Sequence, residues 1–465
     1  MRSRRVLVVA VSFLVVAAVA GAAVAVLWGG RPTPTGPNVV LIVTDDQRWD
    51  TLSRMPNVQR LLVQRGVTFS NGFVVNSLCC PSRASILTGR YSHSTGVYTE
   101  QPPFGGAQRF DDSSTVATWL HDAGYRTGLF GKYLNGYRGT SVPQGWDEWL
   151  AFQQNESHGY YRNYSVNDDG VIRRYGSQAD DYSTDVLARR AVSFVRSSDR
   201  SFFLYFAPYA PHGPADPAPR DRGTVTVGDL PRFDPPSFDE ADVSDKPAWM
   251  HSLPPVTRAD VDAFRVRQYE SLLAVDRAVG EIVHELDVSH RLRRTVIVFV
   301  SDNGLAWGEH RWTRKEVPYE ESIRVPYVIR YDRLVSAPRV DPHLALNIDL
   351  APTIAALAGV EADAPEGRSL VPLLAGRDVR WRSDFLVEHV EGRTQPDPPT
   401  FCAVRTERYL FAVYATGEVE LYDLRTDPFE LRNIAQDQGS LSVIVRLRDR
   451  LAALCRPPPP GFSSP

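Results

Sequence analysis

Lysine and cysteine are scarce in this chain of 465 residues. Only three of its 52 basic residues are lysines, Lys132, Lys246 and Lys315, and there are four cysteines. Four cysteines are too few for a scaffold held together by disulfides. A formal net charge of -3 provides no positive excess for binding nucleic acid. With 43% hydrophobic residues, the chain can build a large core and a smaller second unit.

The four cysteines fall into two pairs. Cys79 and Cys80 are adjacent, which is not the spacing of a zinc site such as Cys-x-x-Cys. Cys402 and Cys455 are far apart in the sequence. They form one disulfide if the protein is exported, and the alternative is a pair of buried free thiols.

The amino terminus predicts export. Arg2, Arg4 and Arg5 precede residues 6–28, which are apolar and uncharged. A helix of this length can cross a membrane, with the arginines on the cytoplasmic side. Two small-x-small sites in the run fit cleavage, so residues 1–28 are either a signal peptide or a signal anchor. Residues 29–37 indicate a linker. We expect the rest to be extracytoplasmic and to meet the membrane only through this segment.

Three apolar runs predict strands that are buried on both faces: Asn38–Thr44, Phe202–Ala207 and residues 295–300. Continuous hydrophobicity is typical of parallel strands covered by helices, and helical patterns lie between the runs. The predicted fold class is α/β, with a large, mixed, mostly parallel sheet that carries helices on both faces. This unit spans residues 38–375. Residues 214–255 are expected to form a long surface insertion within it, either a loop that shapes the substrate site or a mobile excursion. Lys246, in this insertion, is interpreted as a surface residue.

The pattern changes near residue 380. Short strand-like segments with glycine-containing turns follow one another between residues 385 and 422, and an amphipathic helix is predicted at Leu441–Leu454. Residues 380–465 are therefore expected to form a small antiparallel sheet with one helix and a proline-rich tail.

Two of the predicted buried strands end in polar clusters. Asp45 and Asp46 follow the first strand, and Asp302 and Asn303 follow the run at 295–300. In open α/β sheets, ligands bind at the carboxyl ends of strands. Three carboxylates and one amide suit a hard cation, calcium or magnesium. Helix capping would explain one such aspartate, but it explains two matching clusters poorly.

The most specific motif is CCPSRASILTGR at residues 79–90. It resembles the signature of the sulfatase family, Cys-x-Pro-Ser-Arg followed by Leu-Thr-Gly-Arg, and the resemblance spans residues 38–435. The doubled cysteine, the Gly-Lys-Tyr-Leu-Asn segment and the insertion are most similar to the N-acetylglucosamine-6-sulfatase and heparan endosulfatase branch. The resemblance implies an alkaline-phosphatase-like fold. It also implies that a formylglycine-generating enzyme oxidises Cys79 to formylglycine.

The resemblance assigns roles to further residues. Five positions correspond to the metal ligands of the family: Asp45, Asp46, Cys79 as formylglycine, Asp302 and Asn303. The resemblance implies that Lys132 and Lys315 bind the sulfate group and that His212 assists departure of the alcohol together with Lys315. Arg83 holds the formylglycine and the metal ligands in place. We expect one divalent cation, calcium ahead of magnesium.

One position departs from the family pattern. Many sulfatases carry Gly-Lys-Trp-His, in which the histidine serves as a base for sulfate release, and this chain has Leu134 at that position. Leucine cannot accept a proton. Asn135, His93 and His310 are the candidate pocket residues that could take over this role. His389 is a weaker candidate for the pocket.

The predicted function is hydrolysis of sulfate monoesters, on a sugar or a glycosaminoglycan-like substrate. One alternative is a phosphomonoester or phosphonate-ester hydrolase on the same scaffold. A second is a catalytically silent glycan-binding protein in which Cys79 stays unmodified.

Overall fold

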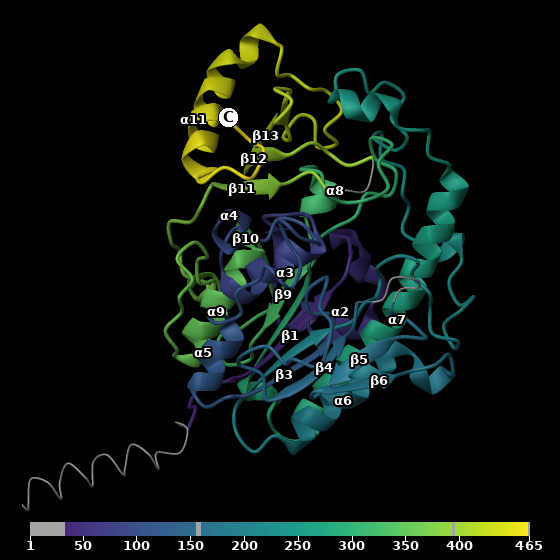
Figure 1. The fold of residues 1–465 in the computed structure, drawn as a ribbon, viewed down its shortest axis with the longest axis vertical. Coiled ribbons are helices and arrows are strands. Elements are labelled where there is room, and N and C mark those ends of the chain that lie inside the picture. The colour runs from purple at the N-terminus through teal and green to yellow at the C-terminus, as the bar shows by residue number, and fades with distance from the viewer. Residues whose placement is uncertain (1–32, 155–159, 393–395, 464–465) are drawn as a thin grey trace, which may run out of the picture.

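The computed structural model describes residues 33–154, 160–392 and 396–463. The apolar run at residues 6–28 lies outside these ranges. Within them, none of the helices combines the length and the hydrophobicity needed to cross a membrane. The described chain forms a large unit around one sheet and a small unit that contains the carboxyl terminus (Figure 1).

A ten-stranded sheet is the centre of the large unit, in the order β10-β2-β9-β8-β1-β7-β3-β4-β5-β6. β1 pairs in parallel with β7 and β8, whereas β9 pairs in antiparallel fashion with β8 and β2. The prediction of a mixed, mostly parallel sheet is confirmed. Its strands are β1 (Asn38–Thr44), β2 (Val67–Phe73), β3 (Arg126–Gly131), β4 (Glu148–Phe152), β5 (Ser165–Asp168), β6 (Val171–Arg174), β7 (Phe202–Ala207), β8 (Thr295–Ser301), β9 (Tyr327–Arg330) and β10 (Arg339–Leu346).

Helices cover both faces of this sheet. Side chains along β1 alternate between two apolar clusters, with Val39 and Leu41 in one and Val40 and Ile42 in the other. The first cluster includes α3, α5 and α9, and the second includes α2, α6 and α7. The helices are α2 (Pro56–Leu61), α3 (Cys79–Thr88), α4 (Ser92–Thr95), α5 (Val116–Asp122), α6 (Ser183–Ser197), α7 (Arg258–Val288), α8 (Glu320–Ile323), α9 (Leu350–Ala358), α10 (Val371–Leu374) and α11 (Leu441–Leu454).

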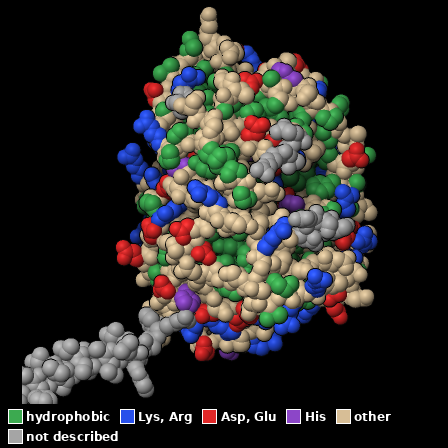
Figure 2. All heavy atoms as spheres, in the orientation of Figure 1, with side chains coloured by type: hydrophobic (Ala, Val, Ile, Leu, Met, Phe, Trp, Pro, Cys, Tyr) green, Lys and Arg blue, Asp and Glu red, His purple; other side chains and the backbone are tan. Residues whose placement is uncertain are grey.

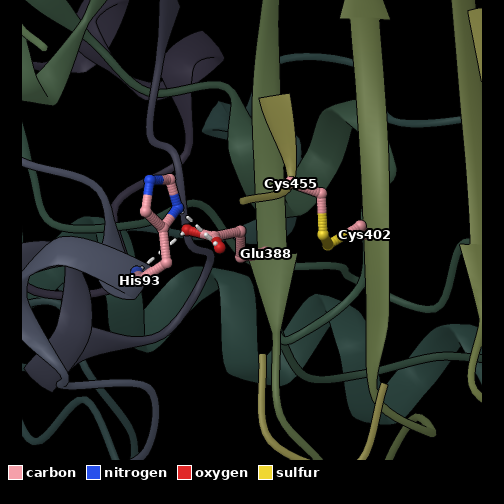
Figure 3. Close-up of a disulfide and its surroundings, with 4 residues drawn as sticks. All are labelled: His93, Glu388, Cys402 and Cys455. Atoms are coloured by element: carbon pink, nitrogen blue, oxygen red, sulfur yellow. Dashed lines mark hydrogen bonds and ion pairs between the residues drawn. A yellow bond between two sulfur atoms is a disulfide. The ribbon is translucent and has the colours of Figure 1, made fainter. Parts of the chain in front are cut away.

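The small unit is a four-stranded antiparallel sheet with one long helix, as predicted. Its strands are β11 (Asp384–His389), β12 (Phe401–Thr406), β13 (Tyr409–Tyr414) and β14 (Val419–Asp423), and α11 packs on β11 and β12. Cys402 of β12 and Cys455 at the end of α11 form a disulfide (Figure 3). Of the two alternatives for these cysteines, the structure therefore contains the disulfide.

The insertion at residues 214–255 contacts the small unit. Lys246, interpreted from the sequence as a surface residue, is 4% exposed. Its Nζ donates to the carbonyl of Leu431 at 2.8 Å, and the Asn433 amide donates to Asp245 at 2.7 Å. The interpretation of Lys246 was wrong because its partners follow β14, far away in the sequence. The insertion thus connects the two units.

The disulfide gives a first prediction. Replacing both cysteines in Cys402→Ala/Cys455→Ala removes a cross-link between residues 53 apart in the sequence. We expect the free energy of unfolding to fall by about 2–4 kcal/mol, because the unfolded chain regains conformational freedom. Denaturant unfolding measures the change. Reductant should destabilise the wild type similarly and leave the variant unaffected; a variant as stable as the wild type would contradict the prediction.

Candidate active site

The two acidic clusters meet at one edge of the sheet. β1 and β8 are neighbours, with Thr44 aligned to Ser301, so the residues that follow them lie side by side. The amide of Asp46 donates to Asp302 Oδ1 at 3.2 Å, and Asn303 Nδ2 donates to Asp46 Oδ1 at 2.7 Å. All of these side chains are buried. The strand-end site expected from the sequence is therefore present as a geometric cluster.

Cys79 reaches this cluster from the first residue of α3. Its Sγ lies 3.5 Å from Asp45 Oδ1 and 4.0 Å from Asp46 Oδ1. A helix N-terminus carries partial positive charge, which favours a bound anion. Arg83, one turn later on α3, donates through Nε to Asp302 Oδ2 at 2.7 Å. One helix thus delivers both the cysteine and the arginine of the motif.

Two buried lysines complete the cluster. Lys132 Nζ donates to Asp45 Oδ2 at 2.6 Å, and Lys315 Nζ lies 2.5 Å from Asp46 Oδ1 and 2.7 Å from Cys79 Sγ. Lys132 follows Gly131, which has a φ of +123°, and a Cβ at residue 131 would lie only 1.9 Å from the Ala207 carbonyl oxygen. Glycine is therefore required immediately before Lys132.

Opposite charges determine the protonation of these groups. Burial raises the pKa of Asp45, but the positive charge of Lys132 and its neighbours outweighs this and holds that pKa well below its usual range. The pKa of Lys132 and of Lys315 is well above normal, because nearby carboxylates outweigh the effect of burial. Burial raises the pKa of the Cys79 thiol well above its usual value. The unmodified thiol is therefore neutral near pH 7.

The donor set fits a divalent cation. Asp45, Asp46, Cys79 and His212 each present a ligand atom within 4.8 Å of the others. Asn303 Oδ1 is buried and has no hydrogen-bond partner among the described residues, so it is free to bind a cation. Carboxylate and amide oxygens are the ligands of hard dications, and a cation would also compensate the buried carboxylates. A candidate metal site is therefore present.

His212 lies at the exposed side of the cluster. Its Nε2 is 3.5 Å from Asp46 Oδ2, its Nδ1 is 2.8 Å from the Gly213 carbonyl, and its ring stacks on Tyr209. The side chain is 27% exposed. Nδ1 donates a hydrogen bond to the Gly213 carbonyl. Nε2 is therefore the nitrogen that faces Asp46 and can exchange a proton with a substrate.

Leu134 and Asn135 lie beside the site but differ in character. Leu134 is 4% exposed and belongs to the apolar cluster that covers one face of the sheet. Asn135 accepts the Ala107 amide at its backbone carbonyl, and its Oδ1 is buried without a hydrogen-bond partner among the described residues. The structure thus accommodates leucine at this position through apolar packing.

The other two candidate pocket histidines contact different groups. His93 Nδ1 is 2.9 Å from Glu388 Oε1 (Figure 3), and its Nε2 is 3.2 Å from Glu366. The two carboxylates outweigh burial and raise the pKa of His93 to about 10. His310 Nδ1 is 2.6 Å from Glu240. Both imidazoles pair with carboxylates from segments distant in sequence, so neither belongs to the cluster around Cys79.

A cavity lies next to the cluster, and most of its lining residues were not predicted from the sequence. It has a volume of about 320 Å³, and its lining includes Leu78 and Glu316, the chain neighbours of Cys79 and Lys315. Glu316 Oε2 and His389 Nδ1 are buried and lack hydrogen-bond partners among the described residues. The sequence offered only the weak signal of His389 for this cavity. The lining also includes Thr99, Glu100, Gln101, Arg314, Glu391 and Asp397.

Fold and site together define a class of protein. It is an α/β enzyme whose sheet edge combines acidic oxygens suited to a dication with buried lysines suited to an anionic ester. The Sulfatase family model matches residues 37–360, and the model for the C-terminal part of N-sulphoglucosamine sulphohydrolase matches residues 308–456. The chain belongs to the sulfatase family of sulfuric ester hydrolases.

Curated relatives place the chain near the N-acetylglucosamine-6-sulfatases. It is 33% identical to the human N-acetylglucosamine-6-sulfatase over 460 residues, which covers 86% of this chain and 81% of that protein. It is 36% identical to the extracellular sulfatase SULF-1 homolog of Drosophila melanogaster over 370 residues, or 76% of this chain. The match spans only a third (33%) of that longer relative.

Solved structures share the fold. The structure of BT4656 in complex with its substrate D-glucosamine-2-N,6-O-disulfate superimposes with a TM-score of 0.77 at 25% identity and covers 91% of this chain and 98% of that chain. The phosphonate monoester hydrolase of Agrobacterium radiobacter gives a TM-score of 0.73 at 23% identity, with 90% and 95% covered. The second likeness concerns the fold alone.

The pairing of Arg83 with Asp302 gives a second prediction. Both side chains are fully buried, so Arg83→Met leaves a buried carboxylate without its partner. We expect the free energy of unfolding to fall by about 3–5 kcal/mol. Arg83→Lys keeps the charge and should lose less. Denaturant unfolding of both variants measures this, and equal losses would show that the charge of Arg83 is not what stabilises the site.

Proposed function

We propose that this protein hydrolyses sulfate monoesters on a sugar, with a 6-sulfated glucosamine as the first candidate. The observation that carries the proposal is the position of Cys79 at the start of α3, where Sγ lies within 4.0 Å of both Asp45 and Asp46 and 2.7 Å from Lys315. This arrangement joins a reacting position to a candidate cation site and to a buried positive charge.

The properties of Cys79 support its conversion to formylglycine. A buried thiol with a raised pKa is neutral, and a neutral thiol is a poor nucleophile. Oxygen is also a better ligand than sulfur for a hard cation. A formylglycine-generating enzyme is accordingly the partner that we propose for maturation. Once converted and metal-bound, this site would supply an oxygen nucleophile and a Lewis acid.

The remaining residues would act on charge and protons. Lys132 and Lys315 stabilise the negative charge that develops on the sulfate oxygens, because both are buried and fully protonated. In its imidazolium form, His212 can donate the Nε2 proton to the departing alcohol and keep the Nδ1 proton that bonds the Gly213 carbonyl. Arg83 holds Asp302 in place through its Nε.

The neighbouring cavity supports a sugar substrate. Its lining includes the chain neighbours of Cys79 and Lys315. It also offers unpaired polar atoms on Glu316 and His389, which can bind hydroxyl or amide groups. The human relative is named N-acetylglucosamine-6-sulfatase, and BT4656 was solved with a glucosamine 6-O-sulfate. Acidic and basic side chains are intermixed on the face in Figure 2, a surface suited to a small substrate rather than to nucleic acid.

Export is supported by two observations. Disulfides such as Cys402–Cys455 form and persist in oxidising compartments. Relatives in Drosophila melanogaster and Caenorhabditis elegans are named extracellular sulfatases. We therefore propose an extracytoplasmic location, with residues 1–28 as signal peptide or anchor, and calcium as the cation ahead of magnesium.

The third prediction tests the function. Protein made in a host with a formylglycine-generating enzyme should release sulfate from N-acetylglucosamine 6-sulfate, and Cys79→Ala should lower kcat about 10³-fold or more. Cys80→Ala should stay within about tenfold of the wild type, because Cys80 packs in the apolar core. Sulfate release and mass spectrometry of the tryptic peptide around Cys79 are the measurements.

Three outcomes would contradict the proposal. Equal losses in the folded Cys79→Ala and Cys80→Ala variants would place the nucleophile elsewhere. Faster turnover of a phosphate or phosphonate ester than of the sulfate ester would favour a phosphoesterase. An unmodified Cys79 in protein from its native host would favour a silent glycan-binding protein.

The fourth prediction concerns the cation. Removal of metal by a chelator should abolish sulfate release, and calcium or magnesium should restore it, because the ligands are oxygens. Asp302→Ala should abolish activity without rescue by metal. Asp384→Asn, which alters an aspartate paired with Arg450 in the small unit, is the matched control and should remain active. Full activity of metal-free wild-type protein would refute the cation site.

A further inference from the structure

A second cluster of potential metal ligands lies where the large and small units meet. It consists of His310 in the loop after β8, Glu321 in α8 and Glu430 after β14. Each offers one ligand atom, and the three atoms lie within 4.8 Å of one another. Figure 1 shows α8 next to the strands of the small unit. The cluster is therefore built from both units and is separate from the ligands around Cys79.

These three side chains are buried and incompletely bonded. His310 is 1% exposed, Glu321 6% and Glu430 0%. His310 Nε2, Glu321 Oε2 and Glu430 Oε1 have no hydrogen-bond partner among the described residues. A buried polar atom without a partner costs about 1–3 kcal/mol, and more if it is charged. Three neighbouring side chains thus each have an unpaired atom that is available to a common ligand.

Neighbouring residues prepare His310 as a ligand. Its Nδ1 lies 2.6 Å from Glu240 Oε2, so Nδ1 carries the proton of that hydrogen bond and the unpaired Nε2 is the nitrogen available to a metal. Metal-binding histidines in proteins almost always donate their other N–H to a carboxylate, a carbonyl or water. Glu240 belongs to the insertion, so a third segment of the chain supports the cluster.

The nearest arginines bind other carboxylates. Arg48 donates to Glu309 at 2.8 Å, and Arg405 donates to Glu320 at 2.6 Å. Burial and nearby carboxylates raise the pKa of Glu321 and of Glu430, so their negative charges need a further positive group to balance them. A dication bound to both carboxylates and to His310 Nε2 would balance them and satisfy all three unpaired atoms.

We propose that His310, Glu321 and Glu430 bind a zinc-type dication that links the two units. Imidazole nitrogen and carboxylate oxygen are both ligands that zinc binds in proteins. Calcium and magnesium prefer oxygen ligands alone, so this site differs in metal preference from the strand-end cluster. The cation also braces the loop that carries Lys315, because His310 and Glu321 lie on either side of Lys315 in the sequence. The proposal does not depend on the proposed function.

The fifth prediction is zinc binding at this cluster. The full chain is stripped of metal and titrated with Zn²⁺ in excess calcium, which keeps the strand-end site occupied. We expect one equivalent to bind, detected by calorimetry and metal analysis, and the melting temperature to rise. Glu430→Gln should weaken binding about 100-fold or more, and Glu240→Gln about 10–100-fold. Glu281→Gln, on the exposed side of α7, should bind like the wild type.

Replacement of zinc by Co²⁺ gives a second readout that needs no variant. Bound at these nitrogen and oxygen ligands, Co²⁺ should show visible absorption that Zn²⁺ displaces. The proposal is overturned if the metal-free wild type binds neither ion, since protons shared among the carboxyl groups and the imidazole would then fill the cluster. It is also overturned if a folded Glu430→Gln protein binds zinc as tightly as the wild type.

Discussion

Charge compensation in the interior is the constraint on which the rest of this structure depends. Asp45, Asp46 and Asp302 are buried at the ends of two central strands, and each buried charge costs several kcal/mol unless it is paired. Lys132, Lys315 and Arg83 supply the pairing. The cluster is therefore a network in which loss of one charge leaves another without a partner.

The fold around the cluster follows from this network. The sheet brings the ends of β1 and β8 together, and α3 must be wholly buried so that both Cys79 and Arg83 reach them. Gly131, the last residue of β3, is paired with Ala207 of β7, and the Lys132 amide donates to the Ala207 carbonyl at 2.8 Å. A helix with a polar face could not be buried in the position of α3, and a side chain at residue 131 would collide with Ala207. These two constraints explain why the sequences around Cys79 and Lys132 are so specific.

Features that depend on neighbouring residues could be predicted from the sequence, and those that depend on distant partners could not. β1 and β7 have the predicted bounds, because a continuous apolar run that stops at an aspartate or a proline defines a buried strand by itself. The acidic residues at the strand ends could also be predicted, because they follow the apolar runs directly in the sequence. His93 and His310, by contrast, pair with Glu388 and Glu240. Nothing near either histidine in the sequence indicates these carboxylates.

The two lysines of the candidate active site are held in different ways, and this difference connects that site to the small unit. Lys132 is fixed by the sheet itself, whereas Lys315 lies in the loop between β8 and α8. Trp312 Nε1 donates to the Lys315 carbonyl at 2.6 Å. The amide of the next residue, Glu316, donates at 3.1 Å to the carbonyl of Ser77, which lies just before α3. The same loop carries His310, and α8 begins with Glu320, which binds Arg405 of β12 at 2.6 Å. The position of Lys315 is therefore tied to the small unit, so that unit helps to position a residue of the candidate active site and also lines the cavity beside it.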